Sequence, residues 1–505
     1  MNYSVIIVRK ISYVMKKSII TIILLLAISP CFAQDFPNTT LGKLAKQLIE
    51  TINSLDQQKQ LTFFHQYETK GIINMGEQRW LKNMAFFDDQ LGGVNVTAVQ
   101  ASPDTNVINM TLHSKKGDYW MSFQTRVLPS EPGKLDGQGL RMLENPTVMA
   151  QYRWPGKVAD EGAIIKEIDR QAAHHNDKND FSGVVLIAKN DKIIFNKAYG
   201  LADQTFKAPN DTATRFNLGS MNKMFTAIAI GQLIQAGKLS FDEPLAEALP
   251  DYPNKAVAAK ITIRQLLSHT SGLGDFFKDE FFTHREKYVS LKSYLPLFQN
   301  DSLQFKPGAR FSYSNAGFIV LGVVIEKVSG EDYFDYIKHH IYQPVGMLRS
   351  GSFKRDSVVT DLATGYTWPD GSNPLHLKPR IMNWQTLPVQ GSSAGGGYAT
   401  ASDLLRFSIA VKNHTLLNAT LTDSLLTGHV QLGDREGMNS VYGYGFIDVS
   451  INGKRTAGHG GGAPGINGDL KFFRDNSYTV VVLGNYDPPS ASSLSDQISA
   501  FLAQQ

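Results

Sequence analysis

The chain has 505 residues, of which 42% are hydrophobic and 19% are charged. This composition is typical of globular proteins and excludes a disordered or fibrous chain. Four basic residues and no acidic residue precede residue 34, and the rest of the chain contains 46 basic and 46 acidic side chains. A neutral chain does not attract polyanions, so we expect no nucleic-acid partner.

The first 33 residues have the features of a secretory signal peptide. Two lysines precede the apolar stretch 19–28, and a small-x-small site ends at Ala33. We therefore predict a signal peptide over residues 1–33, cleaved after Ala33, and a secreted or periplasmic protein; an uncleaved N-terminal anchor is the alternative. Cys31 is the only cysteine, so the mature chain has no disulfide. No later apolar run approaches the roughly 18 residues of a membrane span, so we expect no transmembrane span in the mature chain.

Residues 38–150 are expected to form a small N-terminal α+β module. Apolar residues repeat at helical spacing from Leu41 to Ile52. Residues 107–112 and 119–127 then alternate in the manner of strands. The module contains no cluster of residues that demands chemistry, and its partner is unknown.

Residues 165–505 are expected to form a second unit. Two strand patterns near its start, 184–188 and 193–199, flank Asn190-Asp191, which predicts a hairpin. Helical stretches and loops dominate 220–430. Strand patterns return near the end of the chain, at 444–449, 468–473 and 479–483, before a closing helix at 493–502. This order predicts one antiparallel sheet, built from both ends of the unit, with a helical insertion.

Ser220 and Lys223 lie at the head of a predicted buried helix. Gly219 ends a loop and residues 226–234 form an apolar run, so Ser220 falls in the first helical turn. Residues three apart share one helix face. Burial and the helix dipole both lower the pKa of a lysine in this turn, and the neutral amine can then take the serine proton. The pair indicates a serine nucleophile that works without histidine; a capping serine beside a solvent-directed lysine is the alternative.

A Tyr-x-Asn sequence, which can place a third group near such a serine, occurs twice. Tyr252-Pro253-Asn254 lies in a proline-containing connection, whereas Tyr313-Ser314-Asn315 precedes the apolar helix 318–328. Because side chains at loop-to-helix junctions converge on clefts, we predict that Tyr313 is the functional tyrosine.

A glycine-rich segment, 458–465, lies between two strand patterns near the C-terminus. It contains His459, Gly461 and Gly462. Glycine within a strand marks close approach of the backbone to a neighbour or ligand, and an exposed N–H there can face a developing oxyanion. A glycine-rich hairpin with an incidental histidine is the alternative.

Taken in order, Ser220-x-x-Lys223, Tyr313-Ser314-Asn315 and His459-Gly460-Gly461 resemble the motifs of the class C β-lactamase-like serine hydrolases. That family includes penicillin-binding D,D-carboxypeptidases, esterases and D-aminopeptidases. The resemblance covers about residues 180–485 and includes the segment Leu266-Leu267-Ser268-His269-Thr270-Ser271-Gly272. It implies the α/β fold of the β-lactamase/transpeptidase type, in which helices flank an antiparallel sheet and form an additional subdomain. It also implies that no cofactor is needed.

The resemblance also implies residue roles. Ser220 would be the acylated nucleophile and Lys223 its proton acceptor, while Tyr313 would carry the proton to the leaving group. Asn315 would orient the substrate amide, and the backbone N–H groups of Ser220 and Gly462 would form the oxyanion hole. Whether the lysine amine or a tyrosinate is the base stays open, since the two groups titrate as a coupled pair.

One motif departs from the family pattern. β-Lactamases have Lys-Thr-Gly where this chain has His459-Gly460-Gly461. The cation becomes a titratable imidazole, and the hydroxyl that would hold a substrate carboxylate is missing. This weakens the case for efficient β-lactam hydrolysis and for strict carboxypeptidase action.

Three other patterns are interpreted as structural. The segment 391–395 fits Gly-x-Ser-x-Gly around Ser393, but no strand precedes it and no helix follows directly, so we expect a loop at the edge of the cleft. His269 ends a predicted helix and is expected to be structural. The histidine pairs at 174–175 and 339–340 lack metal-ligand spacing, so no metal site is expected.

The sequence therefore predicts an exported serine hydrolase that forms an acyl-enzyme on Ser220. Its small-molecule or peptide substrate would contain an ester or amide, D-amino-acid peptides included. A D,D-carboxypeptidase or β-lactamase is the first alternative, and a catalytically silent protein that binds peptidoglycan peptides is the second. In a third, the N-terminal module carries the main function by binding a partner or a wall component.

Overall fold

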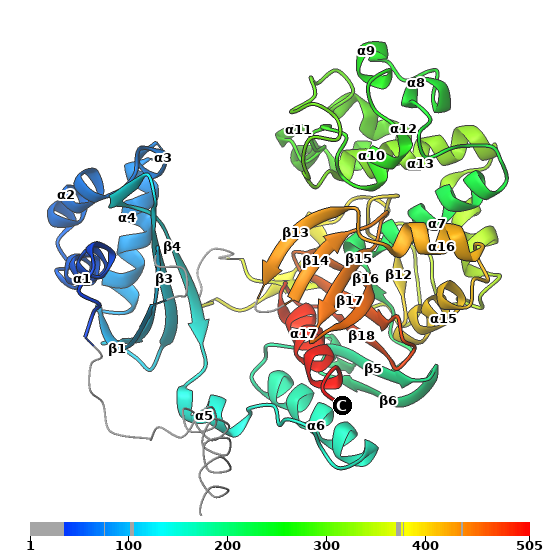
Figure 1. Ribbon diagram of the computed structural model, residues 1–505. Helices are drawn as coiled ribbons and strands as arrows, with labels where there is room; N and C mark the ends of the chain where they lie inside the picture. The colour runs from blue at the N-terminus through cyan, green and yellow to red at the C-terminus, as the bar shows by residue number, and fades with distance from the viewer. Residues whose placement is uncertain (1–34, 75, 102–105, 370–374, 377, 436–437) are drawn as a thin grey trace, which may run out of the picture. The chain divides into compact units, whose positions relative to one another are not determined.

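The computed structural model describes residues 35–74, 76–101, 106–369, 375–376, 378–435 and 438–505 (Figure 1). The chain divides into two compact units, with the boundary between Arg153 and Trp154. The predicted signal peptide lies outside the described residues. Within the described residues, no helix is long and apolar enough to cross a membrane.

The N-terminal unit contains helices followed by a four-stranded antiparallel sheet, as the sequence pattern predicts. The strands are β1 (Val94–Ala101), β2 (Val107–Ser114), β3 (Trp120–Leu128) and β4 (Glu131–Leu143), in the order β1-β2-β3-β4. The helices are α1 (Thr40–Asn53), α2 (Gln57–Tyr67), α3 (Lys70–Ile73), α4 (Glu77–Ala85), the π-helix η1 (Phe86–Gln90) and α5 (Pro146–Gln151). Every second residue of β2 is buried, because α1, α2 and α4 cover one face of the sheet (Figure 1).

The C-terminal unit is built on an eight-stranded antiparallel sheet in the order β13-β14-β15-β16-β17-β18-β5-β6. Strands β5 and β6 form the predicted hairpin. Asn190 and Asp191 in its turn have φ values of 48° and 65°, as a type I′ turn requires. The strands are β5 (Gly183–Lys189), β6 (Lys192–Tyr199), β13 (Val430–Arg435), β14 (Met438–Tyr442), β15 (Ile447–Ile451), β16 (Lys454–Ala463), β17 (Ile466–Phe473) and β18 (Tyr478–Gly484).

Helices cover both faces of this sheet. All seven residues of β18 are buried: Val481 faces the large core that contains α7 and α13, whereas Val480 and Val482 face the core that contains α6 and α17. Figure 1 shows α6 and α17 together on one face of the sheet. A strand buried on both faces loses the polar alternation of an exposed strand, which explains its continuous apolar sequence.

The helical insertion lies between β6 and β13. Its helices are α7 (Asn222–Gln235), α8 (Leu245–Ala248), α9 (Lys255–Ala258), α10 (Ile263–Leu267), α11 (Asp279–Thr283), α12 (Leu291–Tyr294), α13 (Asn315–Ser329), α14 (Tyr333–Ile337), α15 (Ala401–Lys412) and α16 (Ala419–Leu426), and α6 (Glu161–Asp177) and α17 (Ser490–Leu502) flank the sheet. Short 3₁₀ and π turns are η2 (Gly219–Met221), η3 (Arg285–Lys287), η4 (Leu295–Leu297), η5 (Lys338–Tyr342) and η6 (Trp384–Thr386). Three two-stranded ribbons pair β7 (Leu201–Asp203) with β8 (Ala208–Pro209), β9 (Phe216–Asn217) with β12 (Tyr398–Ala399), and β10 (Tyr366–Thr367) with β11 (Ile381–Met382). The architecture confirms the predicted fold class.

Candidate active site

Ser220 lies in the 3₁₀ turn η2, directly before α7, and not in the first α-helical turn expected from the sequence. Glycines let this turn approach strand β16. A Cβ on Gly461 would lie 1.9 Å from the Leu218 carbonyl oxygen, and a Cβ on Gly219 would lie 3.0 Å from Gly462 N. Gly219 also has a φ of 49°, which favours glycine. The serine turn therefore packs against the backbone of β16, next to Gly462.

The Lys223 amine is surrounded by three oxygen atoms. Its Nζ lies 3.1 Å from Ser220 Oγ, 2.8 Å from Asn315 Oδ1 and 2.6 Å from the Ala394 carbonyl oxygen. The amide and carbonyl oxygens can only accept hydrogen bonds, so they take the two hydrogens of a neutral amine. The lone pair of the amine then faces Ser220 Oγ, and the serine hydroxyl donates to it. This is the geometry of a base that removes the serine proton.

The environment of Lys223 makes its neutral form accessible. The side chain is fully buried, and this burial lowers the pKa of the amine to about 7, while the Asp275 carboxylate acts in the opposite direction. At neutral pH a large fraction of this amine is therefore unprotonated. The sequence analysis expected burial to lower the pKa of Lys223, and the structure shows the residue buried.

Tyr313 approaches Ser220 from the start of α13. The following residue, Ser314, caps this helix by accepting the Gly317 N–H at 3.0 Å, which holds the junction in place. The Tyr313 hydroxyl lies near enough to the Ser220 side chain for the two groups to interact. Desolvation raises the pKa of the Tyr313 phenol above its usual value; the interaction with Ser220 opposes this effect and the Asp275 charge adds to it. Tyr313 as a residue is 39% exposed.

Tyr252, the other Tyr-x-Asn tyrosine, lies elsewhere. It is buried between α8 and α9, and its hydroxyl has no hydrogen-bond partner in the described part of the chain. Burial raises the pKa of Tyr252 to about 12. The charged residue that adds to this shift is Asp301, which is not part of the Ser220 site. The structure thus brings Tyr313, and not Tyr252, to Ser220.

Both the oxygen and the nitrogen of the Asn315 side-chain amide form hydrogen bonds within the protein. Its Oδ1 accepts from Lys223, and its Nδ2 donates to Asp275 Oδ2 at 2.9 Å. The Asn315 backbone N–H donates to the same carboxylate oxygen at 3.2 Å. The amide therefore holds Lys223 in place, and its predicted contact with substrate stays a prediction. Asp275 was missed from the sequence because it is a single carboxylate in a loop, without a recognisable motif.

A chain of three buried side chains connects the loop after α10 to β16. Ser314 N–H donates to His269 Nδ1 at 3.1 Å, so the hydrogen of this ring is on Nε2 and is donated to Tyr442 Oη at 3.0 Å. The Tyr442 hydroxyl must then donate to His459 Nε2, also at 3.0 Å, and His459 Nδ1–H donates to the Gly460 carbonyl oxygen at 2.5 Å. The ring centroids of His269 and Tyr313 are 4.2 Å apart, so this chain supports the tyrosine.

These contacts correct the expectation for His459. Burial, and secondarily the charge of Lys223, lower the pKa of this imidazole to about 3. Both ring nitrogens have partners that suit a neutral ring. His459 therefore does not titrate near neutral pH, and it does not replace the positive charge of the β-lactamase lysine. Burial likewise lowers the pKa of His269 well below its usual value.

The loop 391–395 holds the first turns of α7, as expected of a segment at the edge of the site. The Ala394 carbonyl accepts from Lys223, and the Ser393 carbonyl accepts from Thr226 Oγ1 at 2.7 Å. Ser393 itself is fully buried, and its hydroxyl has no partner within the described residues. Those residues contain no group of three or more His, Cys, Asp or Glu side chains placed to hold a metal ion.

Comparison with known proteins agrees with this fold and site. The family model described as Beta-lactamase matches residues 168–505, about two thirds of the chain. The chain therefore belongs to the beta-lactamase family, whose members are serine hydrolases. The resemblance inferred from the motifs is confirmed, and the N-terminal unit lies outside the match.

Individual relatives carry penicillin-binding and amidohydrolase names. Penicillin-binding protein 4* of Bacillus subtilis (strain 168) is 30% identical over 319 residues, which cover 61% of this chain and 69% of that protein. The crystal structure of a penicillin-binding protein from Bacillus halodurans is 36% identical, with a TM-score of 0.57, over 68% of this chain and 99% of that one. A D-stereospecific amidohydrolase from Streptomyces sp. has a TM-score of 0.55 over 67% of this chain and 97% of that one; at 23% identity, this likeness shows the fold alone.

Proposed function

We propose that this protein is an exported serine hydrolase that cleaves an ester or amide through an acyl-enzyme on Ser220. The observation that carries the proposal is the Lys223 amine, 3.1 Å from Ser220 Oγ, with its two hydrogens directed to other oxygens. Lys223 takes the serine proton while Oγ attacks the substrate carbonyl carbon. The backbone N–H groups of Ser220 and Gly462 stabilise the oxyanion.

Tyr313 completes the cycle by moving protons. Through its hydroxyl, the proton taken by Lys223 reaches the leaving group, which departs as an alcohol or amine. Water then attacks the acyl-enzyme, gives a proton back through the same groups, and releases the acid and the free serine. The interaction of the Tyr313 hydroxyl with the Ser220 side chain supports this role.

The substrate that fits best is an ester or amide that does not depend on a bound terminal carboxylate. His459 is neutral, and Gly460 and Gly461 have no hydroxyl to hold a carboxylate. D-amino-acid peptides are included in this class. D,D-carboxypeptidase or β-lactamase action is the second candidate, favoured by the penicillin-binding names of the relatives.

Intact-mass spectrometry of residues 34–505 tests the acyl-enzyme. The protein is mixed with benzylpenicillin in one sample and with p-nitrophenyl acetate in another, and Ser220→Ala is the matched control. We expect a covalent adduct on the wild type, mapped to Ser220, and no adduct on the variant. The reagent that reacts faster assigns the esterase or the penicillin-binding branch. A folded wild-type protein that remains unmodified by both reagents would favour the silent peptide-binding alternative.

Export is part of the proposal and has a separate test. Removal of residues 1–33 leaves a chain that begins at Gln34, with residues 38–150 as a module before the hydrolase unit. When the full chain is expressed with its leader in a bacterial host, we expect the mass of the protein in the periplasm or medium to match a start at Gln34. A chain that keeps the leader at the membrane would support the uncleaved anchor.

A further inference from the structure

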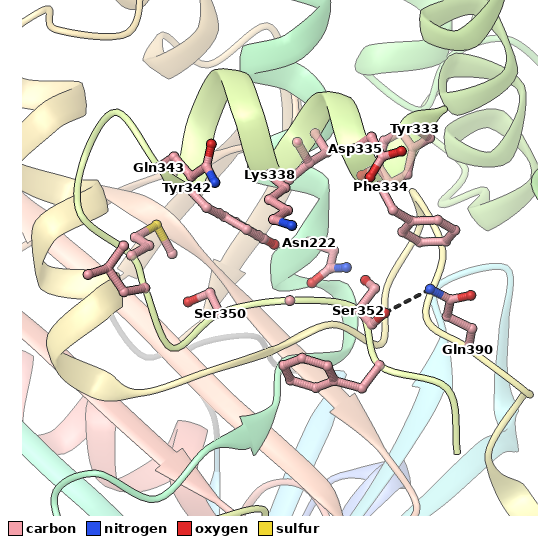
Figure 2. Close-up of a pocket in the computed structure, with 15 residues that line it drawn as sticks. Asn222, Tyr333, Phe334, Asp335, Lys338, Tyr342, Gln343, Ser350, Ser352 and Gln390 are labelled. Carbon is pink, nitrogen blue, oxygen red and sulfur yellow. Dashed lines mark hydrogen bonds between the residues drawn. The ribbon is translucent and has the colours of Figure 1, made fainter. Parts of the chain in front are cut away.

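A cavity lies beside the first turn of α7, where Asn222 lines it. It has a volume of about 390 Å³, within the range of small-molecule sites in proteins. Figure 2 shows side chains from α14 and η5 along one side and the segment around Ser350 and Ser352 along the other. The Gln390 side chain donates to the Ser352 carbonyl oxygen at 2.7 Å and ties this segment to the loop before 391. Neither Ser220, Lys223 nor Tyr313 lines this cavity.

Asn222, one of the residues that line the cavity, has a side-chain oxygen without a partner. Asn222 is 2% exposed and its Nδ2 donates to the Ser392 carbonyl oxygen at 3.2 Å. Its Oδ1 is buried and has no hydrogen-bond partner among the described residues. Because this oxygen is enclosed by protein atoms, Asn222 forms part of the cavity wall and offers no acceptor to a ligand.

The rim of the cavity carries one charge of each sign. Lys338 and Asp335 are exposed, lie three residues apart on consecutive helical turns, and both line the cavity. In the described part of the chain neither has an ion-pair partner, although Glu331 nearby pairs with His339 and His340. A ligand with a carboxylate and an ammonium group matches both charges.

Apolar and aromatic side chains form the walls between these polar groups. The lining includes Phe334, Phe353, Tyr342 and Met347, and Figure 2 shows the rings of Phe334 and Tyr342. Such walls accept a hydrocarbon or aromatic side chain, while a few polar groups set its orientation. The two charges, the apolar walls and the volume together fit a small zwitterionic ligand with an apolar side chain.

We infer that this cavity binds a zwitterionic amino acid or short peptide with an apolar side chain. The ligand carboxylate pairs with Lys338 and its ammonium with Asp335. The ligand side chain packs against the apolar lining, which includes Phe334 and Phe353. This site is separate from the Ser220 site, and the inference does not depend on the proposed hydrolase activity.

Calorimetric titration with phenylalanine tests the site. The protein is residues 34–505 with Ser220→Ala, so that no turnover contributes heat, and both enantiomers of phenylalanine are used. Phenylalaninamide, which lacks the carboxylate, and N-acetylphenylalanine, which lacks the ammonium, are the matched ligands. We expect at least one enantiomer to bind, and both modified ligands to bind about threefold more weakly.

Substitutions then locate the binding. Lys338→Met and Asp335→Asn are each expected to weaken phenylalanine binding about threefold, because each removes one charge pair at an exposed rim. Lys238→Met, at an exposed lysine after α7, is the control and should leave binding unchanged. Absence of binding in the folded protein would overturn the inference. So would binding that neither Lys338→Met nor Asp335→Asn weakens, since the ligand would then occupy another place.

Discussion

Lys223 and Lys471 belong to the same unit and are both buried, with exposures of 0% and 9%, yet their surroundings differ. The partners of Lys223 are a hydroxyl, an amide oxygen and a backbone carbonyl, all uncharged. Lys471, on β17, pairs with the carboxylates of Asp469 and Asp496. Burial lowers the pKa of both amines, but the two carboxylates raise the pKa of Lys471 above its usual value, whereas the pKa of Lys223 falls to about 7.

Burial alone therefore does not make a base. Lys471 keeps its proton, and it joins β17 to α17 in a network where Ser495 donates to Asp469 at 2.6 Å. At Lys223 the nearest carboxylate is that of Asp275. The Asn315 amide lies between this carboxylate and the amine and forms a hydrogen bond with each. Asp275 raises the Lys223 pKa without forming an ion pair that would fix the proton. The chemistry of each lysine follows from the charge of the atoms in direct contact.

Lys223→Met should have the largest effect on activity. Methionine fills the space of the lysine stem but cannot accept the Ser220 proton, so we expect kcat/KM to fall by at least about 10³-fold. The measurement is ester hydrolysis by the purified variant, with circular dichroism to check that it is folded. A variant that retains more than a tenth of the wild-type rate would show that the proton goes elsewhere.

Lys471→Met should destabilise the fold and leave the chemistry intact. The substitution leaves the buried Asp469 carboxylate and the half-exposed Asp496 carboxylate without a cation, and the loss at Asp469 costs about 3–5 kcal/mol of unfolding free energy. Denaturation by guanidinium chloride measures this loss, and kcat per folded molecule should stay within about twofold. Lys454→Met is the control, because the Lys454–Asp475 pair is partly exposed and its loss should cost at most about 1 kcal/mol. Equal effects of the two substitutions would contradict the comparison.

Tyr313→Phe removes the hydroxyl that contacts Ser220 and should reduce kcat about 10²-fold or more. Tyr252→Phe is the matched control, since it removes a buried hydroxyl from the second Tyr-x-Asn sequence. We expect the control to keep the wild-type rate constant. If Tyr252→Phe were the inactive variant, the assignment of the tyrosine would be wrong.

The residues of the site that the sequence predicted belong to local patterns. Ser220 and Lys223 are three positions apart before an apolar helix, and Tyr313 lies at the start of another, so spacing and helix ends indicate them. Asp275 and Tyr442 were not predicted. They are 40 and 17 positions from the residues that they contact, Asn315 and His459, and lie in segments without a motif.

The same distinction applies to the fold and to charge states. The hairpin at Asn190-Asp191 was predicted because its turn is local, whereas the pairing of β18 with β5 joins segments about 290 positions apart. The neutral state of His459 was not predicted, since it depends on burial by residues distant in the chain. The sequence shows which groups are present, and long-range packing determines their protonation.

Among the substitutions within the active site, Asp275→Asn should have the smallest effect on activity, and it tests the origin of the Lys223 pKa. The base acts when it is neutral, so the rate falls as the pH falls through the Lys223 pKa, near 7. The Asp275 charge raises this pKa, and its removal lowers it; the acidic limb of the pH–rate profile should therefore move to lower pH, by about one unit. The maximal rate should also fall about tenfold, because Asn315 loses a charged partner. Asp279→Asn, at an exposed aspartate on α11, is the control and should leave the profile unchanged. An acidic limb that moves to higher pH would show that Asp275 acts on another group, and the contrast between Lys223 and Lys471 would need a different explanation.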